Sequence, residues 1–272
     1  LPIQEVVRRL DDRFSLLTGG SRTALPRHRT LRAVVSWSWE LLDETEALLA
    51  ERLAVFPGAF TLADAEAVCD VPGDVLLSLV DRSLVQTASA ADAPEPRYRM
   101  LDTIAAYAAE RLDASGGTHA TRIAHARHFL ALAEAAEPHL RRAGQLEWLA
   151  RLDGAHDDLL AALRFAADIK DQDTTVRMTA ALGMYWIITG KQDEALEWCE
   201  IASALPGPAP AGARVVVLVG RLMPRFTEID QEAGPAEIRA LLDGLGDADR
   251  GHPFLALIEA GLPIFADDMP AA

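Results

Sequence analysis

Histidines lie close together at one place in the chain and beside carboxylates at another, and these residue types are found in metal sites and in acid–base catalysis. The first group is His119, His125 and His128, of which the last two lie three residues apart on one predicted helix. No cysteine or carboxylate has the spacing to complete a ligand set with them. We therefore predict no metal here and interpret the histidines as part of a solvated or partly packed helix face.

The second group is Asp153, His156, Asp157 and Asp158, which offers a general base beside several acids. Carboxylates and a histidine along one flank of a helix are more often surface charge, and we interpret them in that way. The chain also lacks a GxxxxGK phosphate loop, a GxSxG nucleophile elbow and a credible Cys/His dyad. We predict that this chain is not an enzyme by itself and holds no cofactor of its own.

The composition indicates a folded, acidic protein. Half of its 272 residues (50%) are hydrophobic, and 26 Lys and Arg face 41 Asp and Glu, which gives a formal net charge of −15. This charge argues against nonspecific binding to DNA or to an anionic membrane surface. No apolar run reaches the roughly 18 residues of a membrane span and no secretory signal opens the chain, so we expect a cytoplasmic protein without a membrane partner.

Three further observations concern residues spread over the whole chain. Cys69 and Cys199 lie in apolar helical stretches without CxxC or Cys/His spacing, so we expect buried, reduced thiols. The chain does not begin with Met and opens inside an amphipathic pattern, from which we expect a piece of a longer protein. Trp37, Trp39, Trp148 and Trp186 are interpreted as core residues rather than ligand-stacking ones.

The elements between residues 30 and 114 follow a compact order. Three helices are expected to begin at N-cap side chains, which are Thr30, Asp43 (with Glu46 completing a capping box) and Thr61. A fourth helix follows at 74–82. Residues 83–87 and 98–100 alternate like strands on either side of a Pro-containing loop, and Asp102 stands where the N-cap of the next helix belongs. Four helices, a hairpin and a helix predict a winged helix.

The remainder of the chain is rich in Ala and Leu with helical spacing, including the run 215–219, which we interpret as a buried helix. One helix pair alternates small and large residues in the manner of a tetratricopeptide repeat and is closed by Pro206: Leu182, Gly183, Trp186, Gly190, Ala195, Cys199 and Ala202. Here Gly183 and Ala195 are expected to let the helices approach, and Trp186 to fill the groove between them. Residues 144–169 and 213–245 match more loosely.

The predicted fold class is therefore mainly α, with a winged-helix domain that carries a small β-hairpin and is followed by a tetratricopeptide-like α-solenoid. We predict three parts: residues 1–29 as a linker or the end of a preceding domain, 30–114 as the winged helix, and 118–272 as the helical repeats.

The tryptophan helix at 30–42, together with residues 53–62, 79–85 and 98–102, resembles STAND-class NTPases, above all the actinobacterial AfsR-like (SARP) regulators and their LuxR-type relatives. In those proteins an NB-ARC ATPase core precedes a winged helix and tetratricopeptide-like repeats. The resemblance identifies residues 10–20 as the link from that core. It implies an upstream NB-ARC partner that binds ATP or ADP with Mg²⁺ in the full-length protein.

The same resemblance implies a switch in which ADP holds the core and winged helix closed, and exchange for ATP releases the winged helix for oligomerisation. The nucleotide-reading Met-His-Asp motif of such switches falls on Met100, Leu101 and Asp102, where Leu101 replaces the histidine and cannot donate to phosphate. Asp102 keeps a role as a helix cap. Arg27, His28 and Arg29 form a basic cluster whose guanidinium groups suit phosphate, although a solvated basic linker is the more common explanation, because acidic proteins also carry small basic clusters.

The sequence supports one leading hypothesis about function and leaves three alternatives open. The leading one is a regulatory and interaction module of a STAND-type transcriptional regulator, whose repeats sense a protein or small-molecule inducer and which reaches DNA only through another domain. One alternative is direct DNA binding, for which the candidate recognition helix at 74–82 offers one Arg and two Asp. The others are a plain interaction scaffold without nucleotide coupling and an enzyme with a site between the two domains.

Overall fold

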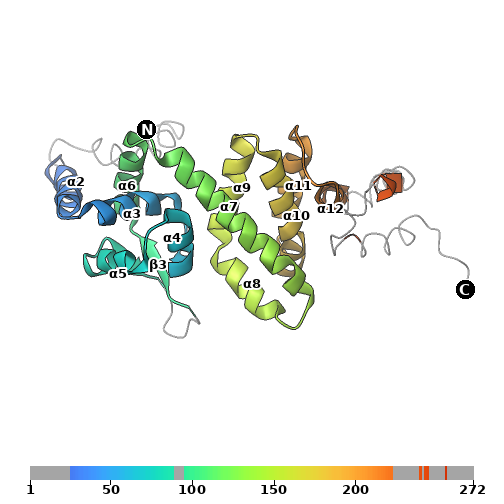
Figure 1. The fold of residues 1–272 in the computed structure, drawn as a ribbon, viewed down its shortest axis with the longest axis horizontal. Helices are drawn as coiled ribbons and strands as arrows, with labels where there is room; N and C mark the ends of the chain where they lie inside the picture. Colours follow the sequence, from blue (N-terminus) through green and yellow to red (C-terminus); the bar gives the residue numbers. More distant parts are fainter. Residues whose placement is uncertain (1–24, 89–94, 223–238, 241, 245–254, 256–272) are drawn as a thin grey trace, which may run out of the picture. The chain divides into compact units, whose positions relative to one another are not determined.

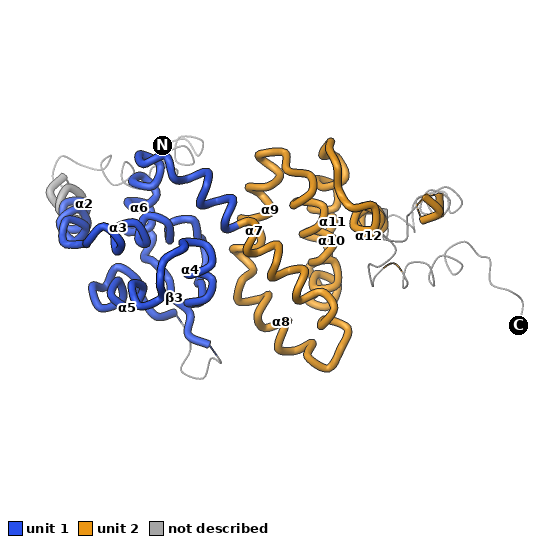
Figure 2. Tube along the Cα trace, viewed as in Figure 1, with its two compact units in different colours: residues 1–125 blue, residues 126–272 orange. Residues whose placement is uncertain are grey.

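The computed structural model describes residues 25–88, 95–222, 239–240, 242–244 and 255 (Figure 1). The chain divides into two compact units, residues 1–125 and 126–272 (Figure 2). The division falls within a long helix, α7. The predicted domain limits, 1–29, 30–114 and 118–272, stay predictions.

The described elements of the first unit are α2 (Leu25–Glu40), α3 (Glu44–Arg52), the 3-10 turn η2 (Leu53–Val55), β1 (Phe60–Thr61), α4 (Leu62–Cys69), α5 (Gly73–Asp81), β2 (Val85–Thr87), β3 (Arg97–Met100) and α6 (Asp102–Ala114). Those that follow are α7 (Thr118–Ala136), η3 (Glu137–Arg141), α8 (Gln145–Gly154), α9 (His156–Asp168), α10 (Gln172–Thr189), α11 (Gln192–Ala204) and α12 (Ala211–Leu222). The mainly helical fold class with a winged helix is confirmed.

Two of the three predicted helix starts are confirmed. The side chain of Asp43 accepts from the backbone N–H of Glu46 while the Glu46 carboxylate accepts from the N–H of Asp43, and Thr61 forms the same reciprocal box with Asp64. The start at Thr30 is wrong, because α2 begins at Leu25 and part of the predicted linker is helical. Pro26 fits there, since the first turn of a helix has no intrahelical partner for its N–H groups.

The sheet has three antiparallel strands in the order β1-β3-β2. The predicted hairpin is confirmed, with Val85 opposite Met100 and Thr87 opposite Tyr98. β1 was not predicted, because two residues are too few to show a period; it pairs Phe60 with Tyr98 on the other edge of β3. Phe60, Tyr98 and Met100 are buried, so the sheet closes one side of the core.

Aromatic side chains fill the rest of that core. Phe56 packs against Phe60 at 4.7 Å between ring centroids, and Trp39 lies edge-on to Tyr107 at 5.2 Å. Trp39 is buried as predicted, whereas Trp37 is 66% exposed. The prediction that Trp37 is a core residue is therefore wrong; Val35 and Trp39 occupy the inward side of α2 instead.

In the second unit α10 lies at the centre and packs against α9, α11 and α12. Tyr185 and Trp186 of α10 are almost fully buried. The run 215–219 is a buried part of α12, as predicted. Trp148 is half-buried, between the extremes of Trp37 and Trp186. A repeat of the tetratricopeptide type stays a prediction.

The residues assigned to repeat packing have mixed outcomes. Leu182, Trp186, Cys199 and Ala202 are buried, Ala195 is half-buried, and Gly190 ends α10 in a left-handed conformation with φ +73°. The role given to Gly183 is wrong, because a Cβ added there would meet nothing within 4 Å. The close approach lies instead between α11 and α12, where a Cβ on Gly220 would stand 2.7 Å from the Sγ of Cys199.

The contact between Gly220 and Cys199 predicts the effect of adding a methyl group at position 220. Gly220→Ala places its Cβ against the buried sulfur, and overpacking of this kind costs about 1–3 kcal/mol, partly offset by up to about 1 kcal/mol of helix propensity. We expect a net loss of about 1 kcal/mol in the free energy of unfolding, measured in urea. The double variant with Cys199→Ala should recover most of it, and a more stable Gly220→Ala protein would refute the contact.

Candidate functional site

The helix α5 occupies the recognition position of the winged helix, directly before the wing strands β2 and β3. Leu76 and Leu79 lie on its buried side. Its exposed side carries Asp74, Leu77 and Asp81, with Leu77 50% exposed. The outward face of this helix is therefore acidic and apolar rather than basic.

One buried carboxylate fixes α5 against α3. Glu46, whose side chain is 6% exposed, accepts a hydrogen bond from the Ser78 hydroxyl at 2.5 Å and from the Nε of Arg82 at 2.9 Å. Its second oxygen accepts the backbone N–H of Asp43 at 3.0 Å. The Ser78 hydrogen bond, supported by Asp43 and Arg82, outweighs burial and holds the pKa of Glu46 below its ordinary value. The cation at the end of α5 is thus engaged inside the chain.

The wing arginines also have partners within the chain. Arg97 donates through Nη1 to the backbone oxygen of Ala59 at 2.6 Å, which ties β3 to the residue before β1. Arg99 pairs with Asp102 at 3.3 Å, and both side chains are more than half exposed. An exposed pair of this kind contributes little to stability and can exchange partners.

The predicted nucleotide-sensing motif lies where β3 meets α6. Met100 is buried in the sheet, and Leu101 is 44% exposed. Leu101, not Asp102, occupies the N-cap position of α6, so the capping role predicted for Asp102 is wrong. Asp102 is the first residue of the helix, where a carboxylate is favoured by the helix dipole. An apolar side chain and a carboxylate do not fit a direct contact with phosphate.

The predicted basic cluster, Arg27, His28 and Arg29, lies in the first turns of α2. The side chains of these residues lie outside the described part of the structure. Their proposed contact with phosphate stays a prediction.

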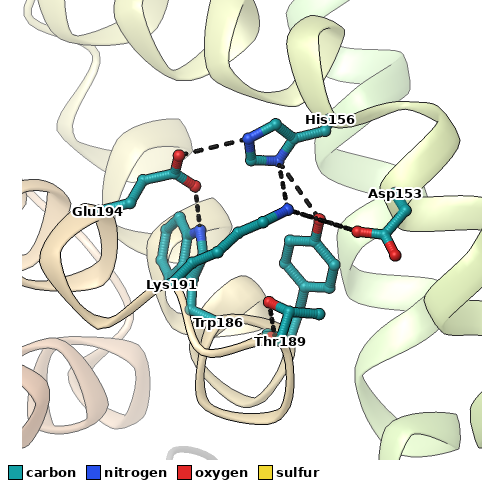
Figure 3. A network of polar contacts seen from close by, with 7 residues as sticks. Asp153, His156, Trp186, Thr189, Lys191 and Glu194 are labelled. Carbon is teal, nitrogen blue, oxygen red and sulfur yellow. Dashed lines mark hydrogen bonds and ion pairs between the residues drawn. The ribbon is translucent and has the colours of Figure 1, made fainter.

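A second polar constellation joins side chains of α8, α9, α10 and α11 in the second unit with Lys191 (Figure 3). Lys191, in the turn between α10 and α11, donates to the hydroxyl oxygen of Tyr185 at 2.6 Å, and its Nζ stands 4.7 Å from the centre of that ring. The Tyr185 hydroxyl donates in turn to Oδ1 of Asp153, on α8, at 2.6 Å. Burial and the carboxylate of Asp153 raise the pKa of Tyr185 above its ordinary value, so the phenol keeps its proton.

His156, the first residue of α9, completes this constellation (Figure 3). Its Nε2 lies 3.3 Å from a carboxylate oxygen of Glu194 on α11, and its Nδ1 lies 3.5 Å from Nζ of Lys191. A carboxylate only accepts and an ammonium only donates. The contacts therefore fit Nε2 as the donor to Glu194 and Nδ1 as the acceptor from Lys191. The other oxygen of Glu194 accepts the indole N–H of Trp186 at 2.5 Å.

The interpretation of Asp153, His156, Asp157 and Asp158 as solvated surface charge is partly wrong. Asp157 is exposed, but Asp158 is 1% exposed and the His156 side chain 23%. Sequence reasoning missed Tyr185, Lys191 and Glu194, which are about 30 residues further along the chain. A signal was available in part, since Asp153/His156 and Lys191/Glu194 share a three-residue spacing. The hydroxyl, ammonium, imidazole and carboxylate groups contact one another, so the arrangement joins α8, α9, α10 and α11.

Two of the three histidines considered as metal ligands, His125 and His128, lie against aromatic rings, and His119 is exposed. His125 is 3% exposed and lies edge-on to Phe56 at 5.2 Å, and His128 lies edge-on to Phe129 at 5.0 Å. Within the described ranges, no three His, Cys, Asp or Glu side chains gather in a way that could hold a metal ion. Burial raises the pKa of Cys69 and of Cys199 to about 12, in keeping with the predicted buried thiols. None of the helices described is long and apolar enough to cross a membrane.

A family model described as a winged helix-turn-helix domain matches residues 41–113. These residues form a winged helix-turn-helix domain. The match covers the span from the end of α2 to α6, including α5 and the wing.

Known proteins similar to this chain include Rv0890c of Mycobacterium tuberculosis and Mb0914c of Mycobacterium bovis, which are described as candidate HTH-type transcriptional regulators. Each is 36% identical over 204 residues, 71% of this chain and 22% of the relative. The uncharacterised protein Rv0894 of Mycobacterium tuberculosis is 36% identical over 132 residues, 46% of this chain and 33% of that protein. The chain thus spans 22% of the length of the first two relatives. No solved structure matches it significantly.

The low pKa of Glu46 predicts an acid-sensitive contribution to stability. A folded-state pKa below the unfolded one stabilises the fold above the unfolded pKa, and this is lost as pH falls through the folded pKa. Glu46→Gln should therefore be less stable than wild type at neutral pH, and the difference should shrink as the pH falls below the ordinary carboxyl value of 4.5 and through the lower folded-state pKa of Glu46. Urea unfolding at several pH values measures it. The exposed Glu44→Gln in the same turn is the control, and a pH-independent difference for Glu46→Gln would contradict the assignment.

The hydrogen bonds of the Tyr185 hydroxyl predict that removing it loosens the turn between α10 and α11. Tyr185→Phe removes the hydroxyl that bridges Lys191 and Asp153, which should cost about 1–3 kcal/mol and free the turn between α10 and α11. Amide hydrogen exchange should accelerate at residues 189–195 while the winged helix is unaffected. Tyr107→Phe, which leaves the constellation intact, serves as the control. Unchanged exchange in the turn would show that the hydroxyl does not hold it.

Proposed function

We propose that this chain is the regulatory and protein-interaction module of a transcriptional regulator, and that its winged helix-turn-helix domain docks on protein rather than on duplex DNA. The observation that carries the proposal is the outward face of α5, with Asp74, Leu77 and Asp81 exposed. The similarity to candidate HTH-type transcriptional regulators supports the regulatory part.

The chemistry of α5 favours a protein partner. A recognition helix in the major groove needs donors for phosphates and base edges, supplied mainly by Arg, Lys, Asn and Gln. Two carboxylates on the exposed side would face the phosphates instead, and Arg82 is bound to Glu46. An exposed leucine between carboxylates suits a partner surface with an apolar pocket rimmed by basic side chains.

Direct DNA binding is the second candidate, and it is favoured by the winged helix-turn-helix match and by the HTH description of the relatives. In that case the wing would supply the phosphate contacts, because Arg99 is exposed and its pair with Asp102 can open. Binding would then fall steeply with salt concentration.

The finer proposal concerns the longer protein. The resemblance to AfsR-like STAND regulators supports an upstream NB-ARC core that binds ATP or ADP with Mg²⁺, a winged helix that follows its state, and helical repeats that sense an inducer. Since Leu101 and Asp102 do not fit phosphate, the nucleotide is assigned to that core alone. Nucleotide-dependent oligomerisation belongs to the same proposal.

The two candidates differ in a binding experiment. The 272-residue chain is titrated into fluorescently labelled mixed-sequence duplex at about 50 and about 200 mM salt, and anisotropy is recorded. The proposal expects no binding at micromolar protein at either salt. The double variant Asp74→Lys/Asp81→Lys, which reverses the charge of α5, should gain salt-sensitive binding and shows that the assay detects it.

Salt-sensitive binding by the wild type that is lost in Arg97→Ala/Arg99→Ala would replace the proposal with direct DNA binding through the wing. A companion measurement uses the natural longer protein in a transcription reporter. Leu77→Ala is expected to change reporter output without changing the thermal unfolding midpoint, because Leu77 is half exposed.

A further inference from the structure

The outward side of α2 carries a row of apolar side chains. Val34, Trp37 and Leu41 are 49%, 66% and 60% exposed, and their spacing of three and four residues puts them on one side of the helix and the turn that follows it. Val35 and Trp39 face the core instead. Contiguous exposed apolar groups of this size mark an interaction surface, and tryptophan is prominent among residues that dominate interfaces.

The row is nearly symmetric about its middle. Trp37 lies between Val34 and Leu41, so two such rows laid antiparallel place Trp37 against the Trp37 of a second copy and Val34 against Leu41 in both directions. A two-fold interface requires this self-complementarity, because the same patch must serve both copies. The spacing of three and four also suits helix-to-helix packing.

The charges at the two ends of the row agree with an antiparallel arrangement. Arg32 precedes it, with its side chain 48% exposed and held in place by Glu110 through two hydrogen bonds of 2.6 and 3.1 Å. Asp43 and Glu44 follow the row and are exposed. Antiparallel pairing brings the ion-paired Arg32–Glu110 end of one copy to the acidic end of the other, whereas parallel pairing would bring the carboxylates of Asp43 and Glu44 in the two copies together.

From these observations we propose that the apolar row of α2 is a self-association surface, on which two copies of this chain pair antiparallel through Val34, Trp37 and Leu41. The contact is one helix wide, well below the area of a permanent dimer, so the association is weak and depends on concentration. The inference is independent of whether the winged helix binds protein or DNA, because α5 takes no part in it.

The first test is the mass of the 272-residue chain by sedimentation velocity over a concentration series up to about 200 μM. We expect the weight-average mass to rise towards that of a dimer. Trp37→Glu, which places two carboxylates face to face at the centre, should stay monomeric. Leu146→Glu is the matched control, since Leu146 is 80% exposed on α8 in the other unit, and it should behave like wild type.

A wild-type chain that is monomeric throughout, or a Trp37→Glu chain that still dimerises with an unchanged circular dichroism spectrum, would overturn the proposal. Circular dichroism also guards against an unfolded variant.

The second test reads the orientation by disulfide formation. Val34→Cys and Leu41→Cys chains are oxidised separately and as an equimolar mixture; the native Cys69 and Cys199 are buried and stay out of the reaction. Antiparallel pairing expects the mixture to form a crosslinked dimer well above the level in either chain alone, because only opposed Cβ atoms come within bridging distance. Efficient crosslinking of Val34→Cys with itself, or none in the mixture, would refute it.

Discussion

The hydrogen bonds of the Glu46 carboxylate are the interactions on which the winged helix depends most. It completes the capping box at the start of α3 and, through Ser78 and Arg82, fixes the direction of α5. A buried charge is costly unless its lone pairs are filled, and here a hydroxyl, a guanidinium and a backbone N–H fill them. The start of α3 and the orientation of α5 are therefore set by one side chain.

The second unit uses the same principle at a different place. The turn between α10 and α11 is held to α8 and α9 by the Lys191–Tyr185–Asp153 chain and by His156 with Glu194. Side chains of types that often serve in acid–base catalysis contact one another here. In each unit these polar side chains fix the positions of helices. The surfaces available for binding are therefore the exposed faces.

Local signals carried most of what could be predicted. The helix starts at Asp43 and Thr61 and the wing hairpin depend on residues close together in the sequence, and all three are present. The helix start predicted at Thr30 is wrong because threonine, a good N-cap residue, is also tolerated inside a helix. The N-cap position predicted for Asp102 is occupied by Leu101. Contacts between distant residues, such as Gly220 with Cys199 or Tyr185 with Asp153, leave no periodic pattern. The acidic character of α5 was readable directly, because charge needs no geometry.

The carboxylates of Asp74 and Asp81 have a consequence inside a cell. A genome offers roughly 10⁶–10⁹ nonspecific sites to a basic helix of this shape, and such sites sequester most copies of a protein that binds them even weakly. On the proposal that this winged helix docks on protein, the exposed carboxylates of α5 would keep nonspecific DNA from competing with the protein partner.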